Sequence, residues 1–458
     1  MEQRETIAAI ATGMSNSGIS IIRLSGPEAI EVADKLFKAK NGKKLSTSES
    51  HKAHYGHIYD GEAVVDEVLV LVMKAPHTYT TEDVVEIDCH GGSFVTNRIL
   101  NLAFRNGARP AEPGEFTKRA FLNGRIDLAQ AESVIDVINS KNEYALKSSV
   151  GTLSGRLSSK IKSMRDEIIY NVAYIESALD DPEHISLDNF GDNLKCIVDK
   201  LINTVDKLLI SVDNGKIFTE GVKTVILGKP NAGKSSLLNT LVGEERAIVT
   251  DIAGTTRDTL EEQINLNGII LKLVDTAGIR HTEDIVEKIG VDKAKKIAKD
   301  ADLIIYVVDS STKLDENDEE ILSLINGSNV IVLLNKSDLN AVTFKEDIEN
   351  YIKCPVITIS AKENIGIDIL EQEVVNMFMS GDINYNDEVM ITKARQKDSL
   401  CNAKESLILV KQSIEDMMPE DFFTIDLMNA YEELGKIIGE SVEEDLVNEI
   451  FSKFCMGK

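Results

Sequence analysis

The stretch GKPNAGKS, Gly228 to Ser235, matches the pattern GxxxxGK[ST]. An apolar run, Val222 to Leu227, precedes it, and Ser236-Leu237-Leu238-Asn239 follows as a helix start. Glycines in such a strand–loop–helix context let backbone N–H groups curl around phosphate groups, and the helix N-terminus adds partial positive charge. We therefore predict a phosphate-binding loop in which Lys234 contacts the β- and γ-phosphates and Ser235 binds Mg²⁺.

Three further motifs follow in chain order, each after an apolar run that is typical of a buried strand. They are Asp275-Thr276-Ala277-Gly278, Asn335-Lys336-Ser337-Asp338 and Ser360-Ala361-Lys362. Asp275 is placed to reach Mg²⁺ through water. The Asp338 carboxylate can accept hydrogen bonds from the N1–H and amino group of guanine, which adenine lacks, so the set predicts GTP rather than ATP. Alone, Asn335 to Asp338 would fit a surface loop equally well. Motifs at the ends of strands that alternate with helices predict a Ras-like parallel α/β domain.

The segment Thr250 to Asp258 lies where a switch I threonine binds Mg²⁺ when the γ-phosphate is present, a role that falls to Thr256. Its form GTTRD resembles the GTPases of the Era, Der and MnmE group. The predicted GTP contacts are Asn231, Ala232, Gly233, Lys234, Ser235, Ser236, Thr250, Asp251, Ile252, Ala253, Gly254, Thr255, Thr256, Asp275, Thr276, Ala277, Gly278, Asn335, Lys336, Asp338, Ser360, Ala361 and Lys362.

The glutamine that orients the attacking water in Ras-like enzymes is replaced by Ile279, which cannot do so. In related GTPases an asparagine at the position of Asn231 helps to bind K⁺. The resemblance implies that main-chain carbonyls near Thr250, Ile252 and Thr255 complete that site. Glu287 is our candidate for orienting the water, although by spacing alone it fits an exposed helix residue. The predicted catalytic set is therefore Glu287, Asn231 and Lys234.

The rest of the chain has two other sequence patterns, one that mixes strands with helices and one that is helical. The predicted fold class is therefore multi-domain, with an α+β domain, a helical domain and the α/β GTPase domain. Residues 1–120 mix strand-like and helix-like segments and predict an α+β domain. Between Leu146 and Leu179 apolar residues recur at spacings of three and four, which predicts a long helix broken near Gly151 or Gly155. Similar helical stretches predict one helical domain built from 121–215 and 381–458, with the GTPase domain, 216–380, inserted between them.

Composition limits the function classes. The chain has 458 residues, 43% hydrophobic and 28% charged, which is typical of a folded, soluble protein. No apolar run approaches the ~20 residues that span a bilayer, and no signal-peptide stretch follows Met1, so we expect a cytoplasmic protein. Five cysteines without a CxxC pair argue against a zinc ribbon or a disulfide framework. A net charge of −26 gives no general attraction to nucleic acid, so RNA binding would need a local basic surface or a basic partner.

Outside the GTPase motifs, several stretches resemble the signatures of one family, the MnmE (TrmE) family of tRNA-modification GTPases. The resemblance covers essentially the whole chain and includes the inserted GTPase domain. The stretches are Ile21 to Gly26, Glu82 to Glu86, His90-Gly91-Gly92, Arg109 to Arg125, Asp127 to Glu132 and Phe454 to Lys458.

The resemblance implies a function in concert with MnmG, a partner that uses FAD and NADH. Together they would install an aminomethyl or carboxymethylaminomethyl group at C5 of the wobble uridine of tRNA. The one-carbon unit would come from 5-formyltetrahydrofolate or methylenetetrahydrofolate. The resemblance further implies a homodimer through a folate-binding-like N-terminal domain, with the folate near Arg23, Glu86, Arg125 and Lys458. Without the resemblance, Arg23, Glu86 and Arg125 fit ordinary surface charges. Cys455 is a candidate nucleophile on chemical grounds.

Two alternatives stay open. The chain could be a GTP-switched ribosome-assembly or RNA-binding GTPase of the Era or Der type, but such proteins carry a basic KH domain with a GxxG loop. The chain has neither feature after residue 380. It could also be a folate-binding protein or a scaffold protein whose GTPase only gates assembly. For the favoured function we expect that GTP and K⁺ bring two GTPase domains together across their switch loops and so speed hydrolysis.

Overall fold

The structure, a computed structural model, describes residues 5–13, 15–243, 262–274, 301–378, 391–440, 442, 444–455 and 457. The chain divides into two compact units. The first contains Met1–Ile135, Thr152–Leu201 and Asn402–Lys458, and the second contains Asp136–Gly151 and Ile202–Cys401. Each unit is therefore assembled from segments that are far apart in the sequence, and the helices that pass between them belong to both.

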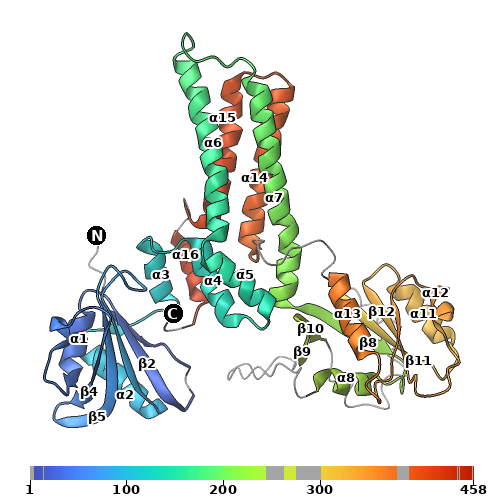
Figure 1. Cartoon of the computed structure of the whole chain (residues 1–458), viewed down its shortest axis with the longest axis horizontal. Helices are drawn as coiled ribbons and strands as arrows, with labels where there is room; N and C mark the ends of the chain where they lie inside the picture. Colours follow the sequence, from blue (N-terminus) through green and yellow to red (C-terminus); the bar gives the residue numbers. More distant parts are fainter. Residues whose placement is uncertain are drawn as a thin grey trace. The chain divides into compact units, whose positions relative to one another are not determined.

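The first unit begins with a seven-stranded sheet in the order β3-β4-β5-β6-β2-β1-β7 (Figure 1). Its strands are β1 (Ile7–Ile10), β2 (Ser17–Ser25), β3 (Phe37–Ala39), β4 (Lys52–Asp60), β5 (Ala63–Met73), β6 (Val84–Gly91) and β7 (Arg109–Pro110). All pairs are antiparallel except β1 with β7. Side chains such as Ile22 and Ile87 are fully buried and pack with the helices α1 (Ala29–Leu36) and α2 (Ser93–Arg105). Because strand side chains alternate, the other face carries Arg23 opposite Glu86.

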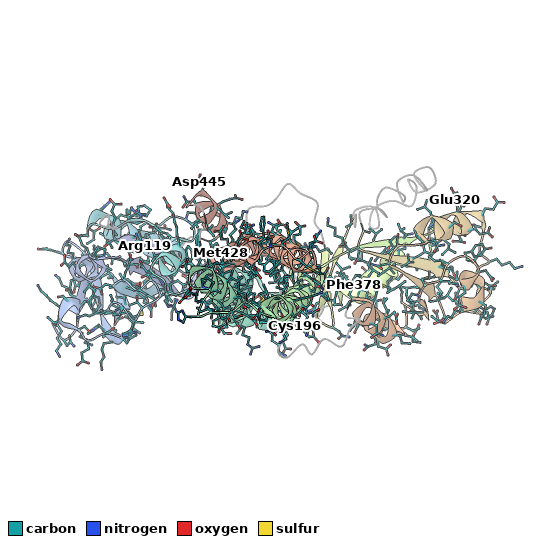
Figure 2. All side chains as sticks on the ribbon, turned by 90° about the horizontal axis from the view of Figure 1, so that it is seen from above. Arg119, Cys196, Glu320, Phe378, Met428 and Asp445 are labelled. Carbon is teal, nitrogen blue, oxygen red and sulfur yellow. The ribbon has the colours of Figure 1, made fainter. Side chains whose placement is uncertain are left out.

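Helices make up the rest of the first unit. Those wholly within it are α3 (Glu115–Leu122), α6 (Arg156–Asp180), α15 (Glu420–Ile438) and α16 (Glu444–Ser452). The helices α4 (Leu128–Asn139), α7 (Phe190–Glu220) and α14 (Ala394–Glu415) extend into the second unit, which also contains most of α5 (Glu143–Leu153). The predicted break in the long helix is confirmed at Gly155, whose φ is +87°. Within the first unit α15 packs along α6, and Lys411 of α14 forms an ion pair of 2.7 Å with Asp199 of α7; Figure 2 looks along these helices. The C-terminal α16 returns to α3 and α4, where Phe451 and Phe454 pack with Phe121.

The second unit contains a six-stranded sheet in the order β13-β12-β11-β8-β10-β9. The strands are β8 (Val222–Gly228), β9 (Glu262–Leu266), β10 (Ile269–Leu273), β11 (Leu303–Asp309), β12 (Val330–Asn335) and β13 (Val356–Thr358). Only β9 pairs antiparallel among these strands. The described helices here include α8 (Lys234–Val242), α11 (Glu316–Ile325), α12 (Lys345–Glu349) and α13 (Ile367–Phe378). The predicted α/β architecture is confirmed. In parallel strands the carboxyl ends share one edge, which gathers the loops after β8, β11, β12 and β13.

Among the residues that the structure describes, no helix is both long and apolar enough to span a bilayer.

Candidate functional site

The loop from β8 to α8 has the backbone shape of a phosphate cradle. Gly228, Asn231 and Gly233 have φ values of +146°, +61° and +98°. A Cβ added to Gly233 would lie 2.1 Å from Nδ2 of Asn335, and one added to Gly228 would lie 2.3 Å from the carbonyl oxygen of Val307. Glycine is therefore required at both positions, because of conformation and because of space. The tight turn leaves the first N–H groups of α8, from Lys234 onward, at the mouth of the loop.

Lys234 lies folded within this loop. Its Nζ donates hydrogen bonds of 2.7 Å each to the carbonyl oxygens of Gly228 and Lys229. Burial lowers the pKa of Lys234, because the charged ammonium loses contact with water there. An anion in the loop would compensate that loss of hydration, so the arrangement fits a phosphate group.

Asn335, the first residue of the predicted Asn335–Asp338 motif, joins two loops. It is 2% exposed, its Nδ2 donates to the Ala232 carbonyl over 2.8 Å, and its Oδ1 accepts from the Ala361 N–H over 3.0 Å. The carbonyl of Ala361 in turn accepts from the Thr240 hydroxyl of α8 over 2.8 Å. The structure thus brings together Ala232, Asn335 and Ala361, three of the predicted GTP contacts.

Asp338 lies at the surface beside the same loops. Its Oδ1 accepts a hydrogen bond of 2.7 Å from the Ser360 hydroxyl. That hydrogen bond lowers the pKa of Asp338, so the carboxylate is held ionised. An exposed, ionised carboxylate beside the Ser360-Ala361 loop is what recognition of the guanine N1–H and amino group requires.

Two supporting contacts were not predicted from the sequence. The Lys336 Nζ lies 2.6 Å from Oδ2 of Asp309, which ends β11. Burial acts to raise the pKa of Asp309, but the hydrogen bonds from Lys336 and Ser311 lower it overall. Asp309 could have been found from the sequence, because it is a charged residue at the end of an apolar strand.

The other unpredicted contact lies under the phosphate loop. Lys229 forms ion pairs with Asp315, at 2.6 Å, and with Asp318. Asp318 is 3% exposed and accepts a hydrogen bond of 2.7 Å from the Tyr306 hydroxyl of β11. The loop is therefore fastened to the start of α11 through a nearly buried carboxylate. The sequence offers no spacing that would have identified this partner.

A second polar site lies on the first unit. The Arg23 Nε of β2 donates to Oε1 of Glu86 on β6 over 2.8 Å, and its Nη1 donates to the Gly457 carbonyl over 3.4 Å. The Arg23 guanidinium lies 5.8 Å from the centre of the Tyr79 ring, and that of Arg125 lies 4.9 Å from the same ring. Arg23, Glu86 and Arg125, predicted from the resemblance, therefore meet around Tyr79 and the end of the chain. Tyr79 itself was not predicted.

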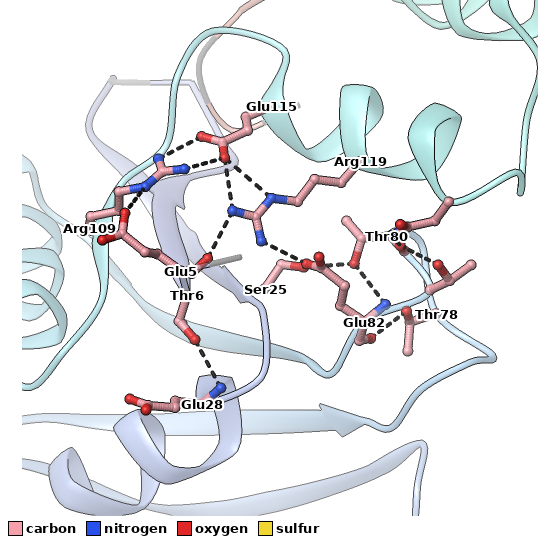
Figure 3. A network of polar contacts seen from close by, with 12 residues as sticks. Glu5, Thr6, Ser25, Glu28, Thr78, Thr80, Glu82, Arg109, Glu115 and Arg119 are labelled. Carbon is pink, nitrogen blue, oxygen red and sulfur yellow. Dashed lines mark hydrogen bonds and ion pairs between the residues drawn. The ribbon is translucent and has the colours of Figure 1, made fainter. Parts of the chain in front are cut away.

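A network of charges supports this second site (Figure 3). Glu115 of α3 accepts hydrogen bonds from Arg109, at 2.7 and 2.9 Å, and from Arg119, at 2.9 Å. Arg119 also donates to Glu82 over 2.8 Å. Burial acts to raise the pKa of Glu115, but hydrogen bonds from Arg109, the Glu112 N–H and Arg119 lower it to about 2. The network holds α3 against the loop that carries Tyr79.

Comparison with known proteins gives the same full-length match. The model described as GTP-binding protein TrmE N-terminus matches residues 6–125, and the model of the MnmE helical domain matches residues 128–455. The tRNA modification GTPase MnmE of Lachnoclostridium phytofermentans is 59% identical over 99% of both chains. The chain belongs to the MnmE family. The MnmE proteins of Thermoanaerobacter pseudethanolicus, 48% identical over 99% of both chains, and of Bacillus subtilis, 47% identical over 99% of this chain and 100% of that protein, are further relatives.

The MnmE resemblance stated from the sequence is thus confirmed, and so is the fold class. The structure places Cys455 at the surface, where its carbonyl accepts from the Gly114 N–H over 3.3 Å. Gly457, with φ +89°, packs against the carbonyl of Ile10 so closely that an added Cβ would lie 2.1 Å away. The described end of the chain is therefore fastened to β1, beside Arg23.

Several predicted residues of the GTP site and of the site around Tyr79 lie outside the described residues, and their roles stay predictions. They are Thr250, Asp251, Ile252, Ala253, Gly254, Thr255, Thr256, Asp275, Thr276, Ala277, Gly278, Glu287 and Lys458.

Proposed function

We propose that this chain binds and hydrolyses GTP and that it acts in the modification of tRNA. The observation that carries the proposal is the joining of the phosphate loop to the base-recognition loops through Asn335, which contacts Ala232 and Ala361. Lys234 holds phosphate oxygens in place of the two carbonyls it now contacts, and Asp338 selects guanine. Membership in the MnmE family supports the tRNA as the molecule acted on.

Hydrolysis needs positive charge at the phosphates and an oriented water. Lys234 and the N–H groups of α8 supply part of the charge. In the proposal Ser235 and Thr256 bind Mg²⁺, and Asn231 with the carbonyls of Thr250, Ile252 and Thr255 binds K⁺. Asn231 lies within the phosphate loop with a φ of +61°, which supports its assignment to this site. Glu287 orients the water, because Ile279 cannot.

The site around Tyr79 is proposed to bind 5-formyltetrahydrofolate or methylenetetrahydrofolate. Glu86 suits the donor pair of a pterin, and Arg125, Arg23 and Lys458 suit the carboxylates of a glutamate tail. Two guanidinium groups gathered 5.8 and 4.9 Å from the Tyr79 ring centre support an anionic ligand there. The folate would supply the one-carbon unit for the uridine C5. Cys455, exposed near this site, is the proposed nucleophile.

The assembly is part of the same proposal. The chain acts as a homodimer through its N-terminal domain and with MnmG, in the cytoplasm. Ile19 and Phe94, 63% and 76% exposed, lie near the Ser17–Gly91 end of the β2–β6 pair, where they offer apolar contact area. The proposed domains are 1–120, 121–215 joined with 381–458, and the inserted GTPase domain 216–380. Contact between two such GTPase domains, in the presence of GTP and K⁺, speeds GTP hydrolysis.

The test is GTP hydrolysis by the purified chain in K⁺ and in Na⁺, with binding of 5-formyltetrahydrofolate measured in the same samples. We expect turnover that depends on K⁺, together with folate binding. The variant Lys234→Ala should lose turnover and keep folate binding, which separates the two sites. Turnover indifferent to the cation, with no folate bound, would contradict the proposal and favour a GTP switch of the Era or Der type.

A further inference from the structure

One edge of the N-terminal sheet is basic in an otherwise acidic chain. Between Lys35 and His57 there are six lysines, three histidines and a single acidic residue, Glu49, whereas the whole chain carries a net charge of −26. This segment forms the end of α1, the strand β3, the short 3₁₀ helix Leu45–Thr47 and the first part of β4. Since β3 is the last strand of the sheet, these charges gather at a free edge.

Aromatic rings lie in a row beside these lysines. Tyr55, His57 and Tyr59 alternate along β4 and so share one face, with the His57 ring centre 6.4 Å from each tyrosine ring centre. The Lys38 Nζ lies 4.3 Å from the Tyr59 ring centre, and the Lys40 Nζ lies 5.3 Å from that of Tyr55. We name these five residues the basic–aromatic edge.

The strands that carry the row are closely packed. Lys38 pairs with His57 across β3 and β4, and the Lys40 N–H donates to the Tyr55 carbonyl over 3.0 Å. A Cβ added to Gly56 would lie 2.2 Å from the Lys38 carbonyl and 2.7 Å from the Phe37 ring. The row is therefore presented on a firm backbone, which limits the entropy lost when a ligand binds.

The edge is open to a ligand. Tyr55 is 43% exposed, although a tyrosine gains stability by burial. Within the part of the chain that the structure describes, no carboxylate forms an ion pair with Lys38, Lys40, Lys43 or Lys44. Exposed lysines beside an exposed tyrosine ring are the two features that RNA-binding surfaces combine, since lysines contact phosphates and rings stack on unpaired bases.

We propose that the basic–aromatic edge binds the RNA on which the chain acts, with Lys38 and Lys40 on its phosphates and Tyr55 against an unpaired base. The inference rests on the proposed action on tRNA. The proposal also explains how so acidic a chain can bind RNA. The negative charge of the rest of the chain repels the RNA phosphates, so the RNA is steered to this edge.

The test compares tRNA binding by the full-length chain, at several salt concentrations, with that of Lys38→Gln/Lys40→Gln and Tyr55→Ala. The control is Lys345→Gln/Lys353→Gln, which removes the same charge from exposed lysines of the second unit. Each lost phosphate contact should lower the slope of log K against log salt by about 0.7, so the double variant should bind about tenfold or more weakly at 0.1 M salt. Loss of the stacked base in Tyr55→Ala should weaken binding by about tenfold. GTP hydrolysis should stay unchanged in every variant.

Three outcomes would overturn the inference. Equal binding by the test and control variants would overturn the edge alone and leave the proposed function intact. A wild-type chain that binds no tRNA would overturn both. Displacement of the tRNA by polyglutamate as readily as by a single-stranded RNA would overturn the RNA assignment in favour of an acidic protein partner.

Discussion

The two polar sites of this chain are built in opposite ways. The phosphate loop comes from the unbroken stretch Gly228 to Ser235, and its shape follows from the glycines within it. The site around Tyr79 comes from separate strands, a helix end and the end of the chain, and its hydrogen bond from Arg23 to Gly457 joins residues 434 positions apart. A site of the first kind tolerates distant changes, whereas a site of the second kind depends on the whole unit.

The largest effect should come from the network behind the Tyr79 site. The folded pKa of Glu115, about 2, lies below its ordinary 4.5, so its stabilisation is complete above pH 4.5 and is lost as the pH falls toward 2. Glu115→Gln should therefore lower the free energy of unfolding at pH 7 by roughly 3 kcal/mol and flatten the dependence between pH 5 and 2. Amide exchange of α3 in urea measures this.

The control for that variant is Glu112→Gln, which changes an exposed carboxylate nearby. It should leave both the stability and its pH dependence close to those of the wild type. GTP binding should be unchanged in Glu115→Gln, because the phosphate loop is locally built. A Glu115→Gln chain as stable at pH 7 as the control would show that the network does not support the fold.

The next effect tests the local site. In Gly233→Ala the new Cβ would strike Asn335 and the residue would keep a φ of +98°. Strain of this kind amounts to about 2–3 kcal/mol, so GTP affinity should fall roughly 30- to 150-fold. Gly243→Ala, where a Cβ would lie 3.5 Å from the nearest atom, is the matched control. Calorimetric GTP affinities that agree between the two variants would refute the cradle, and folate binding should be normal in both.

A change in the guanine-recognition residue Asp338 should have a somewhat smaller effect on GTP binding than Gly233→Ala. Asp338→Asn replaces a charged acceptor by an amide, so it should weaken GTP binding by about 2 kcal/mol, roughly 30-fold. Binding of xanthosine triphosphate, which offers a carbonyl where guanine has its amino group, should improve. Competition binding of the two nucleotides measures the change, and Asp368→Asn, at an exposed position of α13, serves as the control. Unaltered preference in Asp338→Asn would place guanine recognition elsewhere.

The smallest effect should come from one contact of the Tyr79 site. Arg23→Gln removes the partner of Glu86 and one of the two guanidinium groups near Tyr79, and it should weaken 5-formyltetrahydrofolate binding by about 1–2 kcal/mol, roughly tenfold. Arg105→Gln, an exposed arginine of α2, is the control. Folate titrations should separate the two variants while GTP affinity stays equal. Identical folate affinities would remove Arg23 from the site.

The sequence by itself determined those features that depend on residues adjacent to one another along the chain. The glycine spacing of the phosphate loop, the apolar strands of the second sheet and the break near Gly155 all follow from local conformational rules. They were therefore predictable from one chain without knowledge of its fold. Arg23, Glu86 and Arg125 were named only through a family resemblance, since nothing in their local sequence distinguishes them from surface charges.

Only the tertiary structure decided which distant residues meet. The pairing of Lys229 with Asp318, the closure of Glu115 between Arg109 and Arg119, and the placing of Tyr79 under two guanidinium groups arise from strand order and helix packing. So does the row of Tyr55 and Lys40, which β3 brings beside β4. These contacts depend on many weak interactions that act together across the unit, and no single stretch of sequence encodes them.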